Sequence, residues 1–86
     1  MSEETKLEIG KVSHYYSKAG VAVVELSGEL NAGDDILIEG KDINIRQKVT
    51  SMQIEHKDVH KAAAGQSIGM KVDGRVIDGC KVYKII

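Results

Sequence analysis

The sequence predicts an all-β domain, and three observations support this prediction. Short stretches in which apolar and polar residues alternate recur along the chain, which is the pattern of half-buried strands. Residues typical of turns separate these stretches. No apolar repeat of helical period is longer than one turn. In a small domain, closure of the sheet removes edges that promote aggregation, so we expect a closed barrel of six strands.

The chain of 86 residues is long enough for one domain, which would bury roughly 60–65% of the surface that the unfolded chain exposes. Its core must be aliphatic, because the sequence has no Trp, Phe or Pro and its only aromatic residues are Tyr15, Tyr16 and Tyr83. We expect residues 1–5 to form a flexible, solvated tail and residues 6–86 to form a single β-barrel domain.

The first predicted strand, residues 6–16, changes its inward-facing parity at Gly10, where the missing side chain allows a bulge or a bend. Two sets of residues mark the two parities, namely Leu7 and Ile9 before the change and Val12, His14 and Tyr16 after it. Residues 17–20 have turn composition and should close a hairpin with a strand at residues 21–26.

A glycine-bracketed connection at residues 28–35 leads to two further strands. Residues 36–38 should form a short strand and residues 39–42 a turn. Residues 43–49 alternate strictly, which predicts one buried face and one basic face toward solvent.

The middle of the chain contains a change of phase. Val49 and Ser51 follow one alternation, whereas Met52 and Ile54 follow the other, so we expect a β-bulge near Ser51. A polar connection and an Ala-Gly corner then lead to a strand at residues 68–72.

The last predicted strand begins near Cys80 and does not reveal which of its faces is buried. Cys80 and Val82 compete with Tyr83 and Ile85 for the inward positions, because both pairs have the spacing of one strand face.

The charges of the chain nearly cancel, with twelve Lys and Arg against thirteen Asp and Glu. Residues 1–40 carry three bases and eight acids, and residues 41–86 carry nine bases and five acids. The near-zero total disfavours binding that rests mainly on attraction to phosphate. A single cysteine allows no internal disulfide, and no apolar run has the length of a signal peptide or a membrane span, so we expect a cytoplasmic protein with no membrane partner.

No residue set specifies a catalytic, metal or nucleotide site, so we expect no enzyme and no cofactor. His56 and His60 are four residues apart, but on an extended strand they would lie ~13 Å from each other and no third ligand is evident. Ser13-His14 lacks a nucleophile elbow, and Cys80 is more simply a buried apolar residue. Asp34 occupies the position where a phosphate-binding loop needs lysine, which excludes a nucleotide partner.

The residues that favour RNA binding are basic or imidazole side chains in the second half of the chain. They are Arg46, Lys48, His56, Lys57, His60 and Lys61. Tyr15 and Tyr16 could provide stacking surfaces. The alternative is that these charges lie on outward strand faces and only keep the protein soluble.

Several segments resemble the second domain of translational GTPases such as elongation factor Tu, and the resemblance extends from about Leu7 to Ile85. The segments that carry it are residues 9–12, 28–36, 49–53, 59–69 and 77–79. The sequence also resembles stand-alone translation elongation factor-like proteins and the C-terminal barrel of collagenase-like peptidases, especially over residues 12–16 and 51–56.

This resemblance implies a six-stranded closed antiparallel Greek-key barrel of the translation-factor domain 2 type. Our leading hypothesis is a non-enzymatic, translation-factor-like binding module that contacts ribosomal RNA or tRNA. The alternative is a protein-interaction accessory subunit that pairs with a collagenase-like peptidase chain. The chain has no GTPase domain, and its segment between Gly20 and Gly28 lacks the Thr-Gly-Arg-x-Glu run of elongation factor Tu, so we expect no tight binding of aminoacyl-tRNA.

Overall fold

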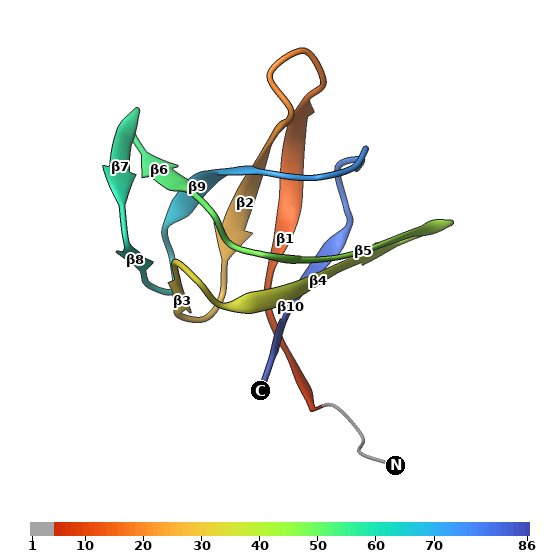
Figure 1. The fold of residues 1–86 in the computed structure, drawn as a ribbon, viewed down its shortest axis with the longest axis horizontal. Helices are drawn as coiled ribbons and strands as arrows, with labels where there is room; N and C mark the ends of the chain where they lie inside the picture. The colour runs from red at the N-terminus through yellow and green to blue at the C-terminus, as the bar shows by residue number, and fades with distance from the viewer. Residues whose placement is uncertain (1–4) are drawn as a thin grey trace.

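The computed structural model describes residues 5–86, so residues 1–4 of the predicted tail lie outside the described part of the chain. The described residues form strands and turns, as the sequence predicts, and Figure 1 shows the path of the chain. The strands are β1 (Lys6–Tyr16), β2 (Val21–Leu26), β3 (Leu30–Asn31), β4 (Asp35–Gly40), β5 (Ile43–Lys48), β6 (Met52–Ile54), β7 (Lys57–Val59), β8 (Lys61–Ala62), β9 (Ser67–Lys71) and β10 (Lys81–Ile85). Within residues 5–86, no helix has the length and apolar character that a membrane crossing requires.

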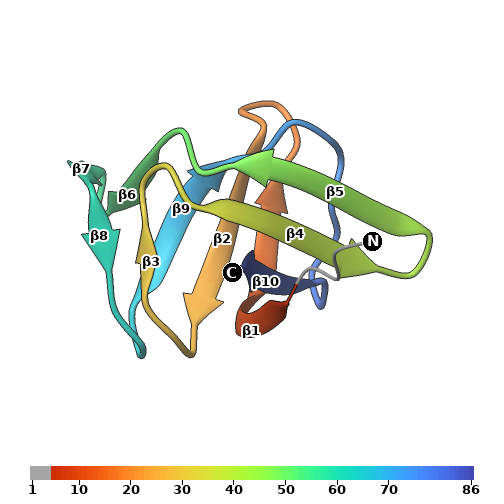
Figure 2. The same cartoon turned by 60° about the horizontal axis from the view of Figure 1, so that its bottom comes forward.

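One eight-stranded sheet contains most of these strands in the order β5-β4-β10-β1-β2-β9-β6-β7, and β3 pairs with β8 beside it. Each of these pairings is antiparallel. Figure 2 shows how the sheet curls, and the buried side chains inside this curl form a single aliphatic core. The largest fully buried side chains include Ile9, Leu30, Ile36, Ile38, Met52, Ile68 and Met70.

The expected closed barrel of six strands needs correction, because the described chain has ten strands and the sheet is not closed by backbone pairing. The edge strands are β5 and β7. A side chain spans the space between β5 and the end of β9, since Gln47 Nε2 donates a hydrogen bond to the carbonyl of Lys71 at 2.9 Å. Gln47 Oε1 also accepts a hydrogen bond from the backbone N–H of Asp73 at 2.8 Å. A Greek-key path stays a prediction.

The predicted bulge near Ser51 is a break between two strands. Residues 49–51 belong to no strand, and β6 begins at Met52. Val49 and Met52 are both buried, as their opposite parities predict. The backbone N–H of Val49 donates to the carbonyl of Asp34 at 2.9 Å, which fixes the chain where it leaves the sheet.

Strand β1 bends at two bulges, of which the sequence predicts one. The register with β10 shifts between Glu8 and Gly10, and a Cβ on Gly10 would come within 2.7 Å of the Glu25 carbonyl oxygen. The register with β2 shifts again between Val12 and His14. This second bulge reverses the parity that we expected for Tyr16, which is 54% exposed.

Val82 of β10 and Cys80, directly before the strand, are buried, which resolves the ambiguous parity of the last predicted strand. The neighbours of β10 in the sheet are β1 and β4. Beyond β10, the backbone N–H of Ile86 donates to the carbonyl of Thr5 at 2.8 Å, so the two ends of the described chain lie side by side.

Candidate functional site

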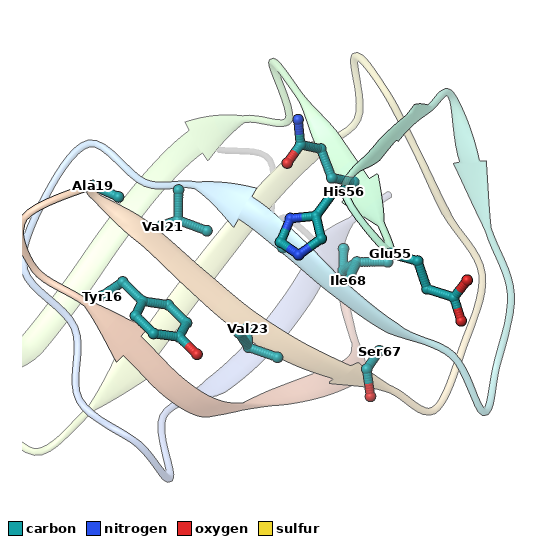
Figure 3. Close-up of a pocket in the computed structure, with 10 residues that line it drawn as sticks. Tyr16, Ala19, Val21, Val23, Glu55, His56, Ser67 and Ile68 are labelled. Carbon is teal, nitrogen blue, oxygen red and sulfur yellow. The ribbon is translucent and has the colours of Figure 1, made fainter.

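A surface groove of about 560 Å³ lies on the outer face of the sheet, between the β1–β2 hairpin and the β6–β7 hairpin. Its lining comes from β1, β2, β6, β9 and the turns between them. Figure 3 shows that Tyr16 and Glu55 lie toward opposite ends of the groove, with Val21, Val23 and the His56 ring between them.

The strand register explains why the floor of this groove is apolar. Ala22 and Val24 point into the core, so Val21 and Val23 on the same strand point outward. Across the sheet, Val23 pairs with Gly69 of β9, and Gly69 pairs with Gln53 of β6. These pairs place two valines and a glycine next to each other on a surface that faces solvent.

Gly69 lowers the floor because it carries no side chain. A Cβ built at Gly69 would meet only Val21 Cγ1, at 3.5 Å, which is an ordinary van der Waals contact. The packing of the domain therefore has room for a side chain at this position. Glycine inside a strand weakens the strand, and it often marks a place where another molecule approaches closely.

The β6–β7 turn forms one wall of the groove. Ile54 pairs with Lys57, so Glu55 and His56 are the two residues of the loop, with φ angles of 52° and 65°. Two-residue hairpin loops with positive φ at both positions are type I′ turns, which favour Asn and Gly. Here two larger polar side chains occupy the turn, and both line the groove.

The groove has an acid at one end, and a lysine lies on the same face of the sheet beside the other end. Glu55 and Ser67 lie at the acidic end. Lys71 does not line the groove, but it pairs across the sheet with Val21, which in turn pairs with Tyr16, so it lies beside the Tyr16 end. Within residues 5–86, neither Glu55 nor Lys71 takes part in an ion pair.

The predicted RNA-binding residues do not form one continuous run in the structure. Arg46 and Lys48 lie on β5, at one edge of the sheet, whereas His56, Lys57 and His60 lie in or beside β7, at the other edge. Of the six candidates, His56 is the one that lines the groove. The basic side chains therefore belong to strands at the two ends of the strand order and not to neighbouring strands.

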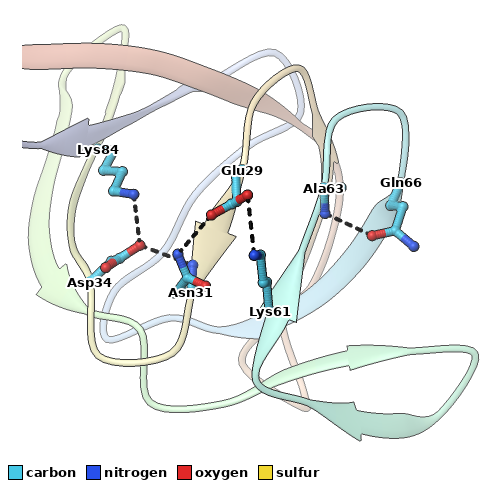
Figure 4. Close-up of polar contacts among 7 residues, drawn as sticks. All are labelled: Glu29, Asn31, Asp34, Lys61, Ala63, Gln66 and Lys84. Atoms are coloured by element: carbon cyan, nitrogen blue, oxygen red, sulfur yellow. Dashed lines mark hydrogen bonds and ion pairs between the residues drawn. The ribbon is translucent and has the colours of Figure 1, made fainter.

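Acidic side chains neutralise two of these bases. Lys48 Nζ lies 3.3 Å from Asp35 Oδ1. Lys61 Nζ lies 3.5 Å from Glu29 Oε2 in the polar cluster of Figure 4.

The polar cluster of Figure 4 explains the glycine-bracketed connection at residues 28–35. Asp34 Oδ2 accepts a hydrogen bond from the backbone N–H of Asn31 at 2.9 Å and lies 3.3 Å from Lys84 Nζ. Gly33 has a φ angle of 92°, a conformation that glycine adopts without strain. The acids of this segment therefore hold β3 against β8 and β10.

Two further titratable residues, Lys6 and Cys80, have structural roles. Lys6 Nζ donates a hydrogen bond to Glu39 Oε1 at 2.7 Å, and this bond and the Glu39 charge raise the pKa of Lys6. Cys80 is buried in the core. No group of three His, Cys, Asp or Glu side chains in residues 5–86 is arranged to hold a metal ion.

The structure defines the chain as a small all-β domain with an open groove on its sheet, and comparisons with known proteins show what it is similar to. No family model matches the sequence. The chain is 45% identical over 83 residues to an uncharacterized protease of Methanocaldococcus jannaschii, in a match that covers 95% of this chain and 20% of the relative. It is 41% identical over 81 residues to a collagenase of Porphyromonas gingivalis, covering 92% of this chain and 20% of the relative. The chain thus spans about one fifth of the length of these curated relatives.

Solved structures show the same fold in part of a peptidase. The C-terminal domain of a Geobacillus thermoleovorans protein named as a U32 peptidase superposes with a TM-score of 0.84 at 22% sequence identity. That match covers 88% of this chain and 96% of the other chain, and a second crystal structure of the domain gives the same TM-score.

These comparisons overturn our leading hypothesis of a translation-factor-like, RNA-binding module. The relatives are named as a protease and collagenases, and the structural neighbours are C-terminal domains of a U32 peptidase. Acids beside Lys48 and Lys61 give a physical reason for the error, since they reduce the net positive charge that would attract phosphate. The findings favour the alternative, which links the chain to collagenase-like peptidases.

Proposed function

We propose that the chain is a non-catalytic protein-interaction domain that serves a collagenase-like peptidase as an accessory subunit. One observation carries this proposal: nearly the whole chain, 95% of it, matches one segment of the protease relative at 45% identity. A domain of this kind would act by contacting the catalytic part of such a peptidase.

The placement of the acidic side chains supports the non-catalytic part of the proposal. Within residues 5–86, five of them form ion pairs with lysines on neighbouring segments. The pairs are Glu39 with Lys6, Asp35 with Lys48, Glu29 with Lys61, Glu8 with Lys81 and Asp34 with Lys84. Cys80, which the sequence analysis considered as a nucleophile, lies in the core at 1% exposure.

The proposal is tested with the M. jannaschii protease from which the segment that matches this chain has been deleted. We expect the purified chain to bind this trimmed protease with a Kd in the micromolar range, about that of a transient interface. Isothermal titration calorimetry measures the affinity, and the deleted segment, added back as a separate peptide chain, is the positive control.

Two outcomes would contradict the proposal. Binding of the trimmed protease to its own segment but not to this chain would remove the interaction role. Hydrolysis of gelatin peptides by this chain alone, in the absence of any protease, would contradict the non-catalytic role.

A further inference from the structure

We propose that the groove holds an extended segment of the partner protein, with apolar side chains on Val21, Val23 and Gly69 and a Lys or Arg side chain beside Glu55. This inference rests on the proposed function for the identity of the partner, the peptidase chain. The chemistry of the bound segment comes from the groove itself.

The floor of the groove fits apolar side chains that recur at every second residue. Val21 and Val23 are two positions apart on β2 and face the same side. A segment lying extended along β2 would present its own alternate side chains to these valines at the same spacing.

Gly69 provides the depth that a bound side chain needs. Since its missing side chain would touch only Val21 Cγ1, no contact inside the domain requires glycine there. An apolar side chain from a partner would fill the space between Val23 and Gln53, the neighbours of Gly69 across the sheet.

Glu55 in the groove and Lys71 beside its other end select the sequence and the direction of the segment. Glu55 and Lys71 lack ion-pair partners within residues 5–86, although five other acids of the chain are paired. A basic side chain on the partner would pair with Glu55, and Lys71 would repel it from the Tyr16 end. The β6–β7 turn keeps Glu55 and His56 at the groove despite their left-handed conformation, which Asn and Gly would adopt at lower cost.

Two synthetic peptides test the inference. The first is acetyl-Ser-Leu-Ser-Val-Ser-Lys-Ser-amide, whose apolar and basic side chains share one face when extended, and the second has Glu in place of Lys. Each is titrated into ¹⁵N-labelled protein, and amide chemical shifts are followed. We expect the Lys peptide to shift the amides of Val21, Val23, Gly69 and His56 in a saturable way and to bind more tightly than the Glu peptide.

Three variants locate the interaction. Glu55→Gln should weaken binding of the Lys peptide by about two- to fivefold, the effect of one exposed ion pair. Asp42→Asn removes one acid from the β4–β5 turn, away from the groove, and should leave binding unchanged. Gly69→Val fills the floor and should weaken binding about tenfold or more, while far-UV circular dichroism and amide dispersion confirm that it folds.

Several results would overturn the inference. They are equal binding of the two peptides, equal effects of Glu55→Gln and Asp42→Asn, shifts confined to residues outside the groove, and concentration-dependent groove shifts without peptide, which would indicate self-association. The proposed function is tested separately with the trimmed protease. If the Gly69→Val variant binds the trimmed protease as tightly as the unchanged chain does, the groove is not the binding site, but the peptidase is still the partner. If the chain binds the Lys peptide but not the trimmed protease, the groove is a binding site, but the peptidase is not the partner.

Discussion

Gln47 shows how one side chain can connect two parts of a sheet that backbone pairing leaves apart. Its alternation with Ile45 and Val49 predicts an inward position, and the structure buries it to 8% exposure. A buried amide needs partners for both its donor and its acceptor. Gln47 finds them on the carbonyl of Lys71 and the N–H of Asp73, so the polar residue in an apolar series holds β5 against the chain that follows β9.

Replacing Gln47 with Ala should destabilise the domain by about 1–3 kcal/mol, because both backbone groups lose their partner. Urea unfolding followed by circular dichroism measures the change. Gln53→Ala is the matched control: Gln53 is exposed, its side chain bonds only to Asp58 at 3.0 Å, and its loss should change stability by less than about 0.5 kcal/mol. Equal losses in the two variants would contradict the bridging role of Gln47.

At the scale of elements, the β6–β7 hairpin combines a strained turn with the wall of the groove. Its two loop residues adopt left-handed angles that cost side-chain-bearing residues more than Asn or Gly. The hairpin is also the edge of the sheet, where local opening requires the fewest broken contacts. The turn therefore has residues that place side chains at the groove, although Asn and Gly would make the β6–β7 hairpin more stable.

The double substitution Glu55→Asn with His56→Gly should stabilise the domain by about 0.5–1 kcal/mol, since both residues suit a type I′ turn. The midpoint of urea denaturation measures the gain. The same dipeptide placed at Lys18 and Ala19 is the control, because neither residue has a positive φ and the added glycine should destabilise the domain. A destabilised β6–β7 variant would show that the turn is not strained.

The sequence predicts the elements that show regular alternation of apolar and polar residues or a glycine at a bend. The inward face of β2, the bulge at Gly10 and the turn at Gly65 agree with the structure. The second bulge of β1, near Ser13, was missed because no glycine marks it. The β6–β7 turn was predicted only as a polar connection, because Glu55 and His56 are not the residues that a type I′ turn favours.

The groove could not be predicted, because its parts are far apart along the chain. Tyr16, Val23, His56 and Gly69 meet only through the register of four strands. His56 was selected from the sequence as an RNA-binding candidate, and it is a groove residue for a different reason. Outward-facing valines on β2 were the one available signal, since a strand with a solvated outer face usually carries polar residues there.

The whole molecule depends on one core, to which nearly every strand contributes. Cys80 belongs to this core and is 1% exposed. Its Sγ lies so close to Gly40 that a Cβ on Gly40 would come within 2.5 Å of it. A reagent therefore reaches the thiol only when Cys80, which lies directly before β10, moves away from Gly40 at the end of β4.

Labelling of Cys80 by a disulfide reagent should follow global unfolding. In a urea series, we expect the fraction of labelled thiol after a short pulse to rise together with the loss of circular dichroism, as in a two-state transition. An engineered Ser51→Cys variant provides an exposed thiol that should react at all urea concentrations. Rapid labelling of Cys80 in the folded protein would show that β10 opens independently of the rest of the domain.

The hydrogen bond between Ile86 and Thr5 makes the domain suitable for grafting. If the domain were inserted into a loop of a host protein, through Thr5 and Ile86, the two ends of that loop would need to be only about 5 Å apart, which is the distance between two paired strands. The β1–β2 turn lies at the far end of the β1 strand from these ends, as Figure 1 shows, and this turn borders the groove. A host protein would thus hold the domain at its base and present the groove outward.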